Sequence, residues 1–481
     1  MTKTKKNLIY QGCYQILIII LPIITAPYVS RVLGTEGVGE YSYSYSVVNY
    51  FVIFAMLGIN NYGNKLIAVE KKNQKSLNKA FSNLYMLHAI ISIMVIATYF
   101  VYVLMSPGNK EYALLSSFYL FGALLDINWL FWGLEELKIT VIRNTILRIV
   151  TIMLVFIFVK NSDDTGKYIF ILAMSNCLSQ VILWREVARR IQFVKPTLNE
   201  MKIHFKPLCV LFVPVIAVSC YKIMDKIMIN SLADVNQVGL YENAEKIINI
   251  PMGLITAVGT VMLPKAASLV RDHNENAVKR CISVTMKYVM ILAIALMYGL
   301  MAIAKDFSII FFGNIFSGTG IMIFGLAITI PFMSFANIIR TQYLIPKDYN
   351  SIFIGSVCAG AVVNVIANRL LIPIYLGNGA VIGTVLAEFT VFIIQVIAVH
   401  NEIPTFKYLF NCLPYTVIGL VMFASVRGIS LVMNQGVLLL LIQVIVGMII
   451  YGSLTIYMLL KTKDDIFVNC FNIIKTTCKK N

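Results

Sequence analysis

The sequence of 481 residues has few charged residues. They make up 13% of it, whereas soluble globular proteins usually carry about 25%. Hydrophobic residues account for 59%, and the mean hydropathy is +0.80. This composition excludes an ordinary soluble globule, because the apolar segments are too many and too long for a single core. Runs of roughly 18 or more apolar residues are typical of transmembrane helices. The sequence therefore predicts an all-α integral membrane protein.

Patterns for metals, nucleotides and nucleic acids are also missing. The nine cysteines form no CxxC pair and the four histidines lie far apart, so we expect no metal site. No Walker A segment is present, which argues against ATP hydrolysis by this chain. The net charge of +17 does not indicate nucleic acid, because the basic residues lie in short stretches between apolar runs and not on one basic domain.

Apolar runs of transmembrane length predict about 14 helices. The expected spans cover residues 8–30, 38–60, 80–105, 113–134, 139–160, 168–187, 207–230, 237–263, 282–304, 318–345, 350–373, 379–400, 407–427 and 437–460. An even number of spans puts both termini on one side of the membrane. The connections on the opposite side are short, which argues against a catalytic domain there and hence against an enzyme.

The distribution of lysine and arginine predicts the orientation. Segments 1–7, 65–79, 185–206, 265–280 and 461–481 hold 23 of these residues, whereas the opposite connections hold six. The six are Arg31, Lys110, Lys160, Lys167, Lys305 and Arg427. Because cytoplasmic loops are enriched in lysine and arginine, both termini are expected in the cytoplasm, with segment 461–481 as a basic cytoplasmic tail.

The sequence contains a weak internal repeat at an offset of 200 residues. "VGEYSYSYSVVNYF", from Val38, aligns with "VGLYENAEKIINIP", from Val238. Lysines at 6, 65 and 79 recur at 206, 265 and 279. The repeat predicts two parallel six-helix lobes, 7–190 and 207–400, around a central cavity, with two additional helices at 407–460. Parallel repeats of this kind are a transporter architecture.

The repeat also decides how the alternating Tyr-Ser segment 41–46 folds. Strict alternation favours a strand, but the second copy contains good helix formers and does not alternate. An open strand would also leave backbone groups unpaired in lipid. We therefore expect a helix that follows an outer turn containing Arg31 and the glycines.

Polar stripes and neighbouring charges make up the candidate substrate cavity. Positions i, i+3, i+4 and i+7 share a helix face, and both copies carry polar residues there. The candidates are Arg31, Ser42, Tyr45, Ser46, Asn49, Arg148, Lys222, Lys226, Glu242, Glu245, Lys246 and Asn249. Charges within a membrane are costly and tend to face a cavity or a partner. The basic groups either bind an anionic head group or form structural ion pairs between helices.

Three intramembrane carboxylates are candidates for coupling to an ion, Na+ or H+: Asp126, Asp225 and Glu388. Each also has a structural interpretation. Asp126 lies near Asn128 and would bond a neighbouring helix, Asp225 would pair with a lysine, and Glu388 follows a run of small residues that favours close helix packing. Apart from such an ion, no cofactor is expected.

Several segments resemble the oligosaccharide flippases of the Wzx type. They are "APYVSRVLGTEGVGEYSYSYSVVNYF", "FWGLEELKITVIRN", "DKIMINSLADVNQVGLYENAEKI" and "QYLIPKDYN". The resemblance implies a bacterial cell-membrane protein that moves oligosaccharide repeat units to the outer leaflet for capsule or exopolysaccharide assembly. Their carrier would be undecaprenyl pyrophosphate, and a polysaccharide polymerase and assembly proteins would be partners.

Two other transport functions and one enzymatic function stay open from the residues. A multidrug or toxin cation antiporter, from the superfamily that contains the Wzx-type flippases, would favour an acidic cavity. The intramembrane lysines and arginines argue against that function. A lipid II or teichoic-acid flippase shares the anionic lipid carrier, so composition does not separate it. A polymerase or glycosyltransferase would need larger outer loops.

Overall fold

The computed structural model describes residues 3–106, 108–464 and 467–468, with backbone alone at 3–20, 214, 217 and 220–222. The secondary structure of the described chain is helical, and it contains no strand. The first half comprises α1 (Lys3–Met56), α2 (Ile59–Glu70), α3 (Gln74–Met105), α4 (Lys110–Leu124), α5 (Asn128–Gly133), α6 (Leu137–Phe158), η1 (Ser162–Asp164), α7 (Thr165–Val187) and α8 (Leu198–Leu232). The second half comprises α9 (Val235–Arg271), α10 (Glu275–Phe312), η2 (Asn314–Phe316), α11 (Ser317–Ala327), α12 (Thr329–Ile339), η3 (Arg340–Leu344), α13 (Asn350–Tyr375), α14 (Gly377–Val399), α15 (Thr405–Val432) and α16 (Val437–Lys461).

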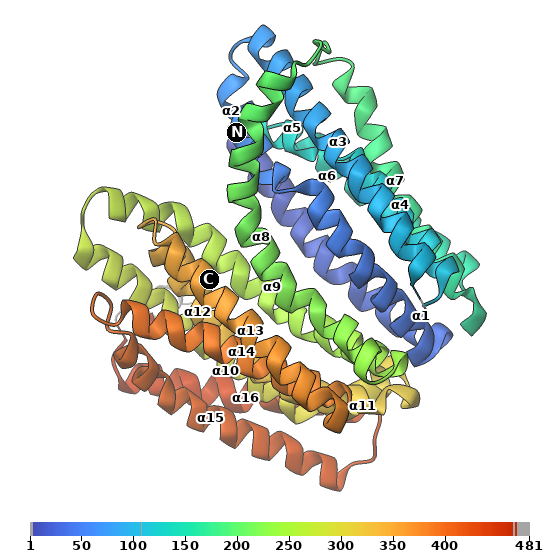
Figure 1. The fold of residues 1–481 in the computed structure, drawn as a ribbon. Coiled ribbons are helices and arrows are strands. Elements are labelled where there is room, and N and C mark those ends of the chain that lie inside the picture. Colours follow the sequence, from blue (N-terminus) through green and yellow to red (C-terminus); the bar gives the residue numbers. More distant parts are fainter. Residues whose placement is uncertain (1–2, 107, 465–466, 469–481) are drawn as a thin grey trace, which may run out of the picture. The chain divides into compact units, whose positions relative to one another are not determined.

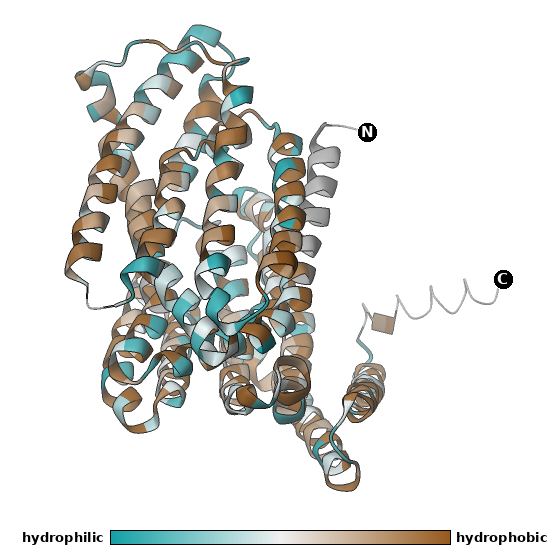
Figure 2. Ribbon diagram, turned by 90° about the vertical axis from the view of Figure 1, so that its right-hand side faces the viewer, coloured by the Kyte–Doolittle hydropathy of each residue, from teal (hydrophilic) through white to brown (hydrophobic). Residues whose placement is uncertain are grey.

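Most helices are long and apolar enough to cross a membrane. Eleven helical segments of the described chain meet that requirement, or 12 if the bent pair 314–327 and 329–344 is one span. Figure 2 shows hydrophobic residues along the helices and hydrophilic ones more often at their ends and connections. Helices satisfy their backbone groups internally, as a lipid environment requires. The predicted all-α membrane class is confirmed; the count of 14 spans stays a prediction.

The Tyr-Ser segment lies within helix α1, as the repeat predicts. The expected outer turn before it is present as a sharp kink at Gly34, whereas Arg31 and the other glycines are helical. Two helical segments meet here, and Gly34 between them leaves helical geometry, with φ of 69° and ψ of −174°. Glycine adopts a positive φ without the steric cost of a Cβ. A kink at one residue therefore replaces a loop, and Arg31 lies on the helix just before it.

The chain divides into two compact units. The first contains residues 1–243 and 361–383, and the second contains 244–360 and 384–481. In the first unit, α1 packs against α3, α4, α6 and α7 (Figure 1). In the second, α10 packs against α11, α12, α15 and α16. The predicted lobes 7–190 and 207–400 and the pair 407–460 stay predictions, and most of the predicted tail 461–481 lies outside the described residues.

Several ion pairs lie at one end of the helices within each unit. In the first unit, Arg190 contacts Glu136 at 2.7 Å, and two further pairs join lysines and glutamates of nearby segments. In the second unit, Lys347 contacts Glu275 at 2.9 Å and Glu402 at 3.3 Å. All of these residues belong to connections on the predicted cytoplasmic side or to the helix ends next to them. Each unit thus brings its predicted cytoplasmic connections together.

Candidate functional site

A buried ionic cluster joins α1, α8 and α9 in the first unit. Lys226 Nζ on α8 lies 2.6 Å from Glu242 Oε2 on α9, and both side chains are largely buried. Ser42 Oγ on α1 donates to the same carboxylate oxygen at 2.6 Å. Of the two interpretations of these charges, the structure shows the ion pair between helices for Lys226. Glu242 therefore connects the two polar stripes directly, because Ser42 and Glu242 belong to equivalent positions of the repeat.

Asp225, the neighbour of Lys226, binds a separate set of polar groups. Its Oδ2 accepts from the Tyr241 hydroxyl at 2.6 Å, and its Oδ1 accepts from Asn368 Nδ2 at 2.6 Å. Asn368 Nδ2 also donates to Asn364 Oδ1 at 3.2 Å. All four side chains are at most 2% exposed. Short hydrogen bonds to an ionised acceptor are the strong ones, so this arrangement suits a carboxylate held in place.

Glycines at equivalent repeat positions allow α1 and α9 to cross closely. A Cβ on Gly39 would lie 1.9 Å from the carbonyl oxygen of Val235, and one on Gly239 would lie 2.1 Å from that of Thr35. Each glycine thus faces the residue four positions before the other glycine. Thr35 Oγ1 also donates to Asn236 Oδ1 at 2.7 Å. Small residues let membrane helices approach to backbone contact. The two copies of the repeat contribute equivalent residues to this contact, so it is symmetric between them.

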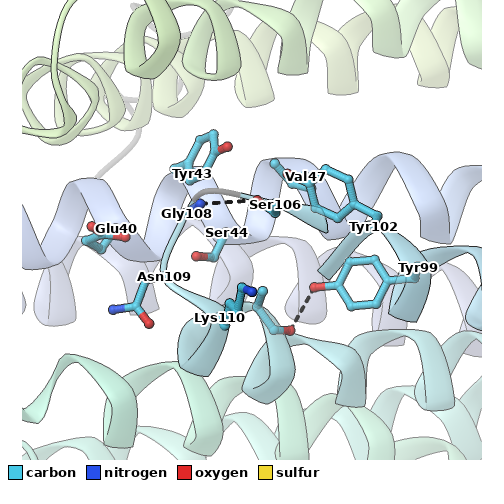
Figure 3. A pocket seen from close by; sticks show the side chains of 11 residues that line it. Glu40, Tyr43, Ser44, Val47, Tyr99, Tyr102, Ser106, Gly108, Asn109 and Lys110 are labelled. Carbon is cyan, nitrogen blue, oxygen red and sulfur yellow. Dashed lines mark hydrogen bonds between the residues drawn. The ribbon is translucent and has the colours of Figure 1, made fainter. Parts of the chain in front are cut away.

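On a helix, the alternating Tyr-Ser residues separate onto different faces. Ser42 faces Glu242, whereas Tyr45 packs edge-on against Tyr119 of α4, with ring centroids 5.1 Å apart. Tyr43 and Ser44 line a small hollow beside the connection between α3 and α4 (Figure 3). The alternation therefore does not mark one common surface.

A cavity of about 170 Å³ lies within the first unit. Polar lining residues include Tyr45, Asn49 and Asp126. The backbone N–H and side-chain amide of Asn128 donate to Asp126 Oδ1, at 2.8 and 2.9 Å. These bonds are local, to a residue two positions along the chain, so the expected bond from Asp126 to a neighbouring helix stays a prediction. The cavity is polar and large enough for several water molecules, each of which occupies about 30 Å³ in the liquid.

The other predicted residues are dispersed. Ser46 is buried on α1, Arg31 is exposed, Arg148 on α6 is partly buried, and Asn249 on α9 is exposed. Glu245 and Lys246 on α9 and Glu388 on α14 belong to the second unit, where Glu388 is buried. The side chain of Lys222 lies outside the described residues.

Sequence reasoning missed several buried polar residues. Tyr241 was visible only as the repeat counterpart of Tyr41, and the spacing of Asn364 and Asn368 by four residues signals a common helix face. Arg143 on α6 is buried and donates to the Ser179 carbonyl at 2.7 Å. Its position within "FWGLEELKITVIRN" gives no local sign of burial.

The fold and the buried charges define a multi-pass membrane protein with a transporter fold. The chain is similar to the lipid II flippase MurJ in an inward closed conformation, with a TM-score of 0.78 at 14% identity, covering 95% of this chain and 99% of that one. It is also similar to an outward-facing multidrug resistance transporter of the MATE family, with a TM-score of 0.54 at 15% identity, covering 83% and 94%. These likenesses show the fold.

The family follows from the sequence comparison. Residues 4–270 match the family described as polysaccharide biosynthesis protein, and the chain belongs to that family. It is 23% identical over 387 residues to a Shigella dysenteriae protein provisionally named an O-antigen transporter, covering 79% of this chain and 96% of that protein. A protein of the same name from Escherichia coli K12 is 25% identical over 269 residues, covering 55% and 65%. The predicted relationship to Wzx-type proteins is confirmed.

Proposed function

We propose that this protein is a flippase for lipid-linked oligosaccharides in a bacterial cell membrane. It would move repeat units on undecaprenyl pyrophosphate from the inner to the outer leaflet, for capsule or exopolysaccharide assembly, with both termini in the cytoplasm. The supporting observation is the buried Ser42–Glu242–Lys226 cluster in a polysaccharide biosynthesis protein. An ion pair within membrane helices is costly to desolvate, so its presence between α8 and α9, with a hydroxyl from α1, calls for a role beyond packing.

The cluster offers a way to couple substrate binding to helix contacts. Glu242 is shared between Lys226 on α8 and Ser42 on α1. An anionic pyrophosphate that binds Lys226 would compete with the Glu242 carboxylate for the same ammonium group. The displaced Glu242 would then shift its contact with Ser42, next to the crossing of α1 and α9. Substrate binding would thus favour a different packing of these helices, as population shift by differential affinity requires.

Other cations would complete the head-group site. We assign initial capture of the pyrophosphate to the predicted cations Arg31, Arg148, Lys222 and Lys246, whose charge suits an anionic head group. Guanidinium groups bind phosphate oxygens with two hydrogen bonds, whereas lysine acts as a compact charge. Alternating exposure of these groups to the two sides would carry the sugars across, and a polymerase would then use the exported repeat units.

The test is polysaccharide export by a deletion strain that carries each variant. Arg31→Ala, Arg148→Ala, Lys222→Ala and Lys246→Ala should lower export at normal membrane levels, by about tenfold or more for a contact worth 1.4 kcal/mol. The matched control replaces four exposed cations of the predicted cytoplasmic segments with alanine: Lys65, Lys72, Lys75 and Arg185. Full export by all four site variants would overturn the assignment, as would an equal loss in the control.

For ion coupling, Asp225 has the strongest structural support among the three candidates. It is 2% exposed and held by two hydrogen bonds of 2.6 Å. Among the described residues, Asn368 Oδ1 and Asn364 Nδ2 have no hydrogen-bond partner, so the Asn368 carbonyl oxygen is available beside the carboxylate. Na+ prefers such oxygen ligands, and a proton would bind the carboxylate itself. Transport into proteoliposomes should depend on a Na+ or H+ gradient and lose that dependence in Asp225→Asn. Transport that is indifferent to both gradients in the unmodified protein would refute coupling.

A further inference from the structure

A second cavity lies in the second unit, and none of its lining residues belongs to the ionic cluster. It measures about 540 Å³ and is bounded by α10, α11 and α15. This volume falls in the range of small-molecule sites, roughly 300 to 1,000 Å³. The lining residues are Met301, Ala304, Lys305, Ser317, Gly318, Gly320, Ile321, Phe324 and Arg427. We call it the outer pocket, because the distribution of lysine and arginine predicts that this end of α10 lies on the outer side.

The outer pocket contains two cations and no acid. Lys305 and Arg427 come from helices more than a hundred residues apart, yet they belong to the six basic residues predicted on the outer side. Within the described part of the chain, neither side chain forms a salt bridge. The adjacent Asp306 carboxylate is buried and accepts instead from Ser430, at 3.2 Å, and from two glutamines. The pocket therefore carries positive charge that the described protein does not neutralise.

The register of the helices puts the two cations at one level. α10 and α15 run parallel, because a Cβ on Gly419 would lie 2.3 Å from the Tyr298 ring while Ser430 contacts Asp306 farther along. Arg427 on α15 is thereby level with Lys305 on α10.

The opposite end of the pocket is apolar. A Cβ on Gly320 would lie 2.9 Å from Lys305 Cα, which fixes the packing of α11 on α10. Phe324 follows one helical turn deeper, about 5–6 Å along the axis. Met301 lies one turn before Lys305 and also lines this end. Phe324 and Ile321 are 40% and 65% exposed, so the apolar wall opens toward the lipid.

The first turn of α11 adds to the positive potential of the charged end. Ser317 and Gly318 line the pocket at the start of this helix of 11 residues. The N-terminus of a helix carries partial positive charge and attracts anions. Lys305, Arg427 and this helix end therefore converge on one region, with the apolar wall beneath it.

We propose that the outer pocket binds an anionic phospholipid of the outer leaflet. The phosphodiester would lie between Lys305 and Arg427 beside the start of α11, and an acyl chain would pack along Ile321 and Phe324. A zwitterionic lipid would bind less well, because its own cation opposes the two basic side chains. This site depends on the membrane location of the chain and is independent of the transported substrate.

Native mass spectrometry of the full-length protein in detergent tests the site. Phosphatidylglycerol and phosphatidylcholine with identical acyl chains are titrated against the unmodified protein and Lys305→Gln/Arg427→Gln, which keeps long polar side chains. A basic residue near an anionic lipid surface contributes about fivefold in affinity, so the double variant should bind phosphatidylglycerol about 30-fold more weakly. The matched control is Lys110→Gln/Lys160→Gln, which removes the same charge from the same predicted side and should bind normally.

The outcomes separate a specific site from general attraction. Preference for phosphatidylglycerol that falls only in the pocket variant supports the proposal. Equal losses in the two double variants, or no preference between the two lipids, would overturn it. Glycerophosphate that displaces the lipid at equal concentration would show that the head group suffices, which contradicts the acyl-chain contact. A thermal unfolding profile matching that of the unmodified protein confirms that the pocket variant is folded.

Discussion

Asp225 in the first unit and Asp306 in the second are equally buried, each 2% exposed, yet their surroundings differ. Asp225 accepts two hydrogen bonds of 2.6 Å and lies next to Lys226, which pairs with Glu242. Asp306 accepts from Ser430, Gln435 and Gln443 at 3.2 to 3.4 Å, near the predicted outer ends of its helices.

The difference indicates what each carboxylate contributes. Short hydrogen bonds from groups on separate helices fix the position of Asp225 inside the membrane-spanning region. The longer bonds to Asp306 leave a looser cluster close to the helix ends, where water reduces the cost of a charge. The same degree of burial therefore accompanies short hydrogen bonds around Asp225 and longer ones around Asp306.

The largest expected effect comes from breaking the ionic cluster. Glu242→Ala removes the carboxylate from Lys226 and Ser42, and removing one partner of a buried ion pair costs about 3–5 kcal/mol. Thermal unfolding of the purified protein in detergent should show a marked loss of stability. Lys226→Met/Glu242→Met, which removes both charges, should be more stable than Glu242→Ala. A double variant less stable than the single one would contradict a paired charge.

Asparagine at each aspartate tests the comparison directly. Asp225→Asn presents an NH2 group to donors on Tyr241 and Asn368, and hydrogen bonds to charged groups contribute about 1.5–3 kcal/mol. Asp306→Asn should cost less, about 1 kcal/mol or below, because its bonds are longer. The measurement is the melting temperature together with transport. Equal destabilisation by the two substitutions would remove the distinction, and loss of ion dependence should occur in Asp225→Asn alone.

A third carboxylate, Asp464, lies outside the membrane-spanning segments. We expect it to make the free energy of unfolding depend on acid pH, with a smaller effect. Burial alone would raise the pKa of Asp464, but hydrogen bonds from Lys287, the Phe467 backbone N–H and Tyr288 lower the pKa to about 2. Because the folded pKa lies below the unfolded value, its stabilisation is complete above pH 4 and is lost as the pH falls toward 2. The loss should amount to about 2 kcal/mol.

Thermal unfolding between pH 5 and pH 2.5 measures this effect of Asp464. Asp464→Asn should be less stable at pH 5 and should show a weaker decline with acid. An unchanged pH profile in the variant would exclude this carboxylate as the source.

The sequence by itself determined the membrane class, the helical state of residues 41–46 and the equivalence of Gly39 with Gly239. The first two follow from the length of the apolar runs and from the cost of unpaired backbone groups in lipid. The third follows from the internal repeat at an offset of 200 residues. It also identified Lys226 and Glu242 as candidate cavity residues, without pairing them.

Only the tertiary structure decided which polar groups meet. Asn368 reaches Asp225 across 143 positions of sequence, and no local pattern specifies that contact. Lys305 and Arg427 look like isolated loop charges until α10 and α15 bring them to one pocket. Contacts between residues so far apart in the sequence depend on how closely the helices approach. Small residues at the helix crossings, such as Gly39 and Gly320, set that distance. The periodicity of polar residues predicts which side chains share a helix face. The packing of the helices decides which residues of another helix that face contacts.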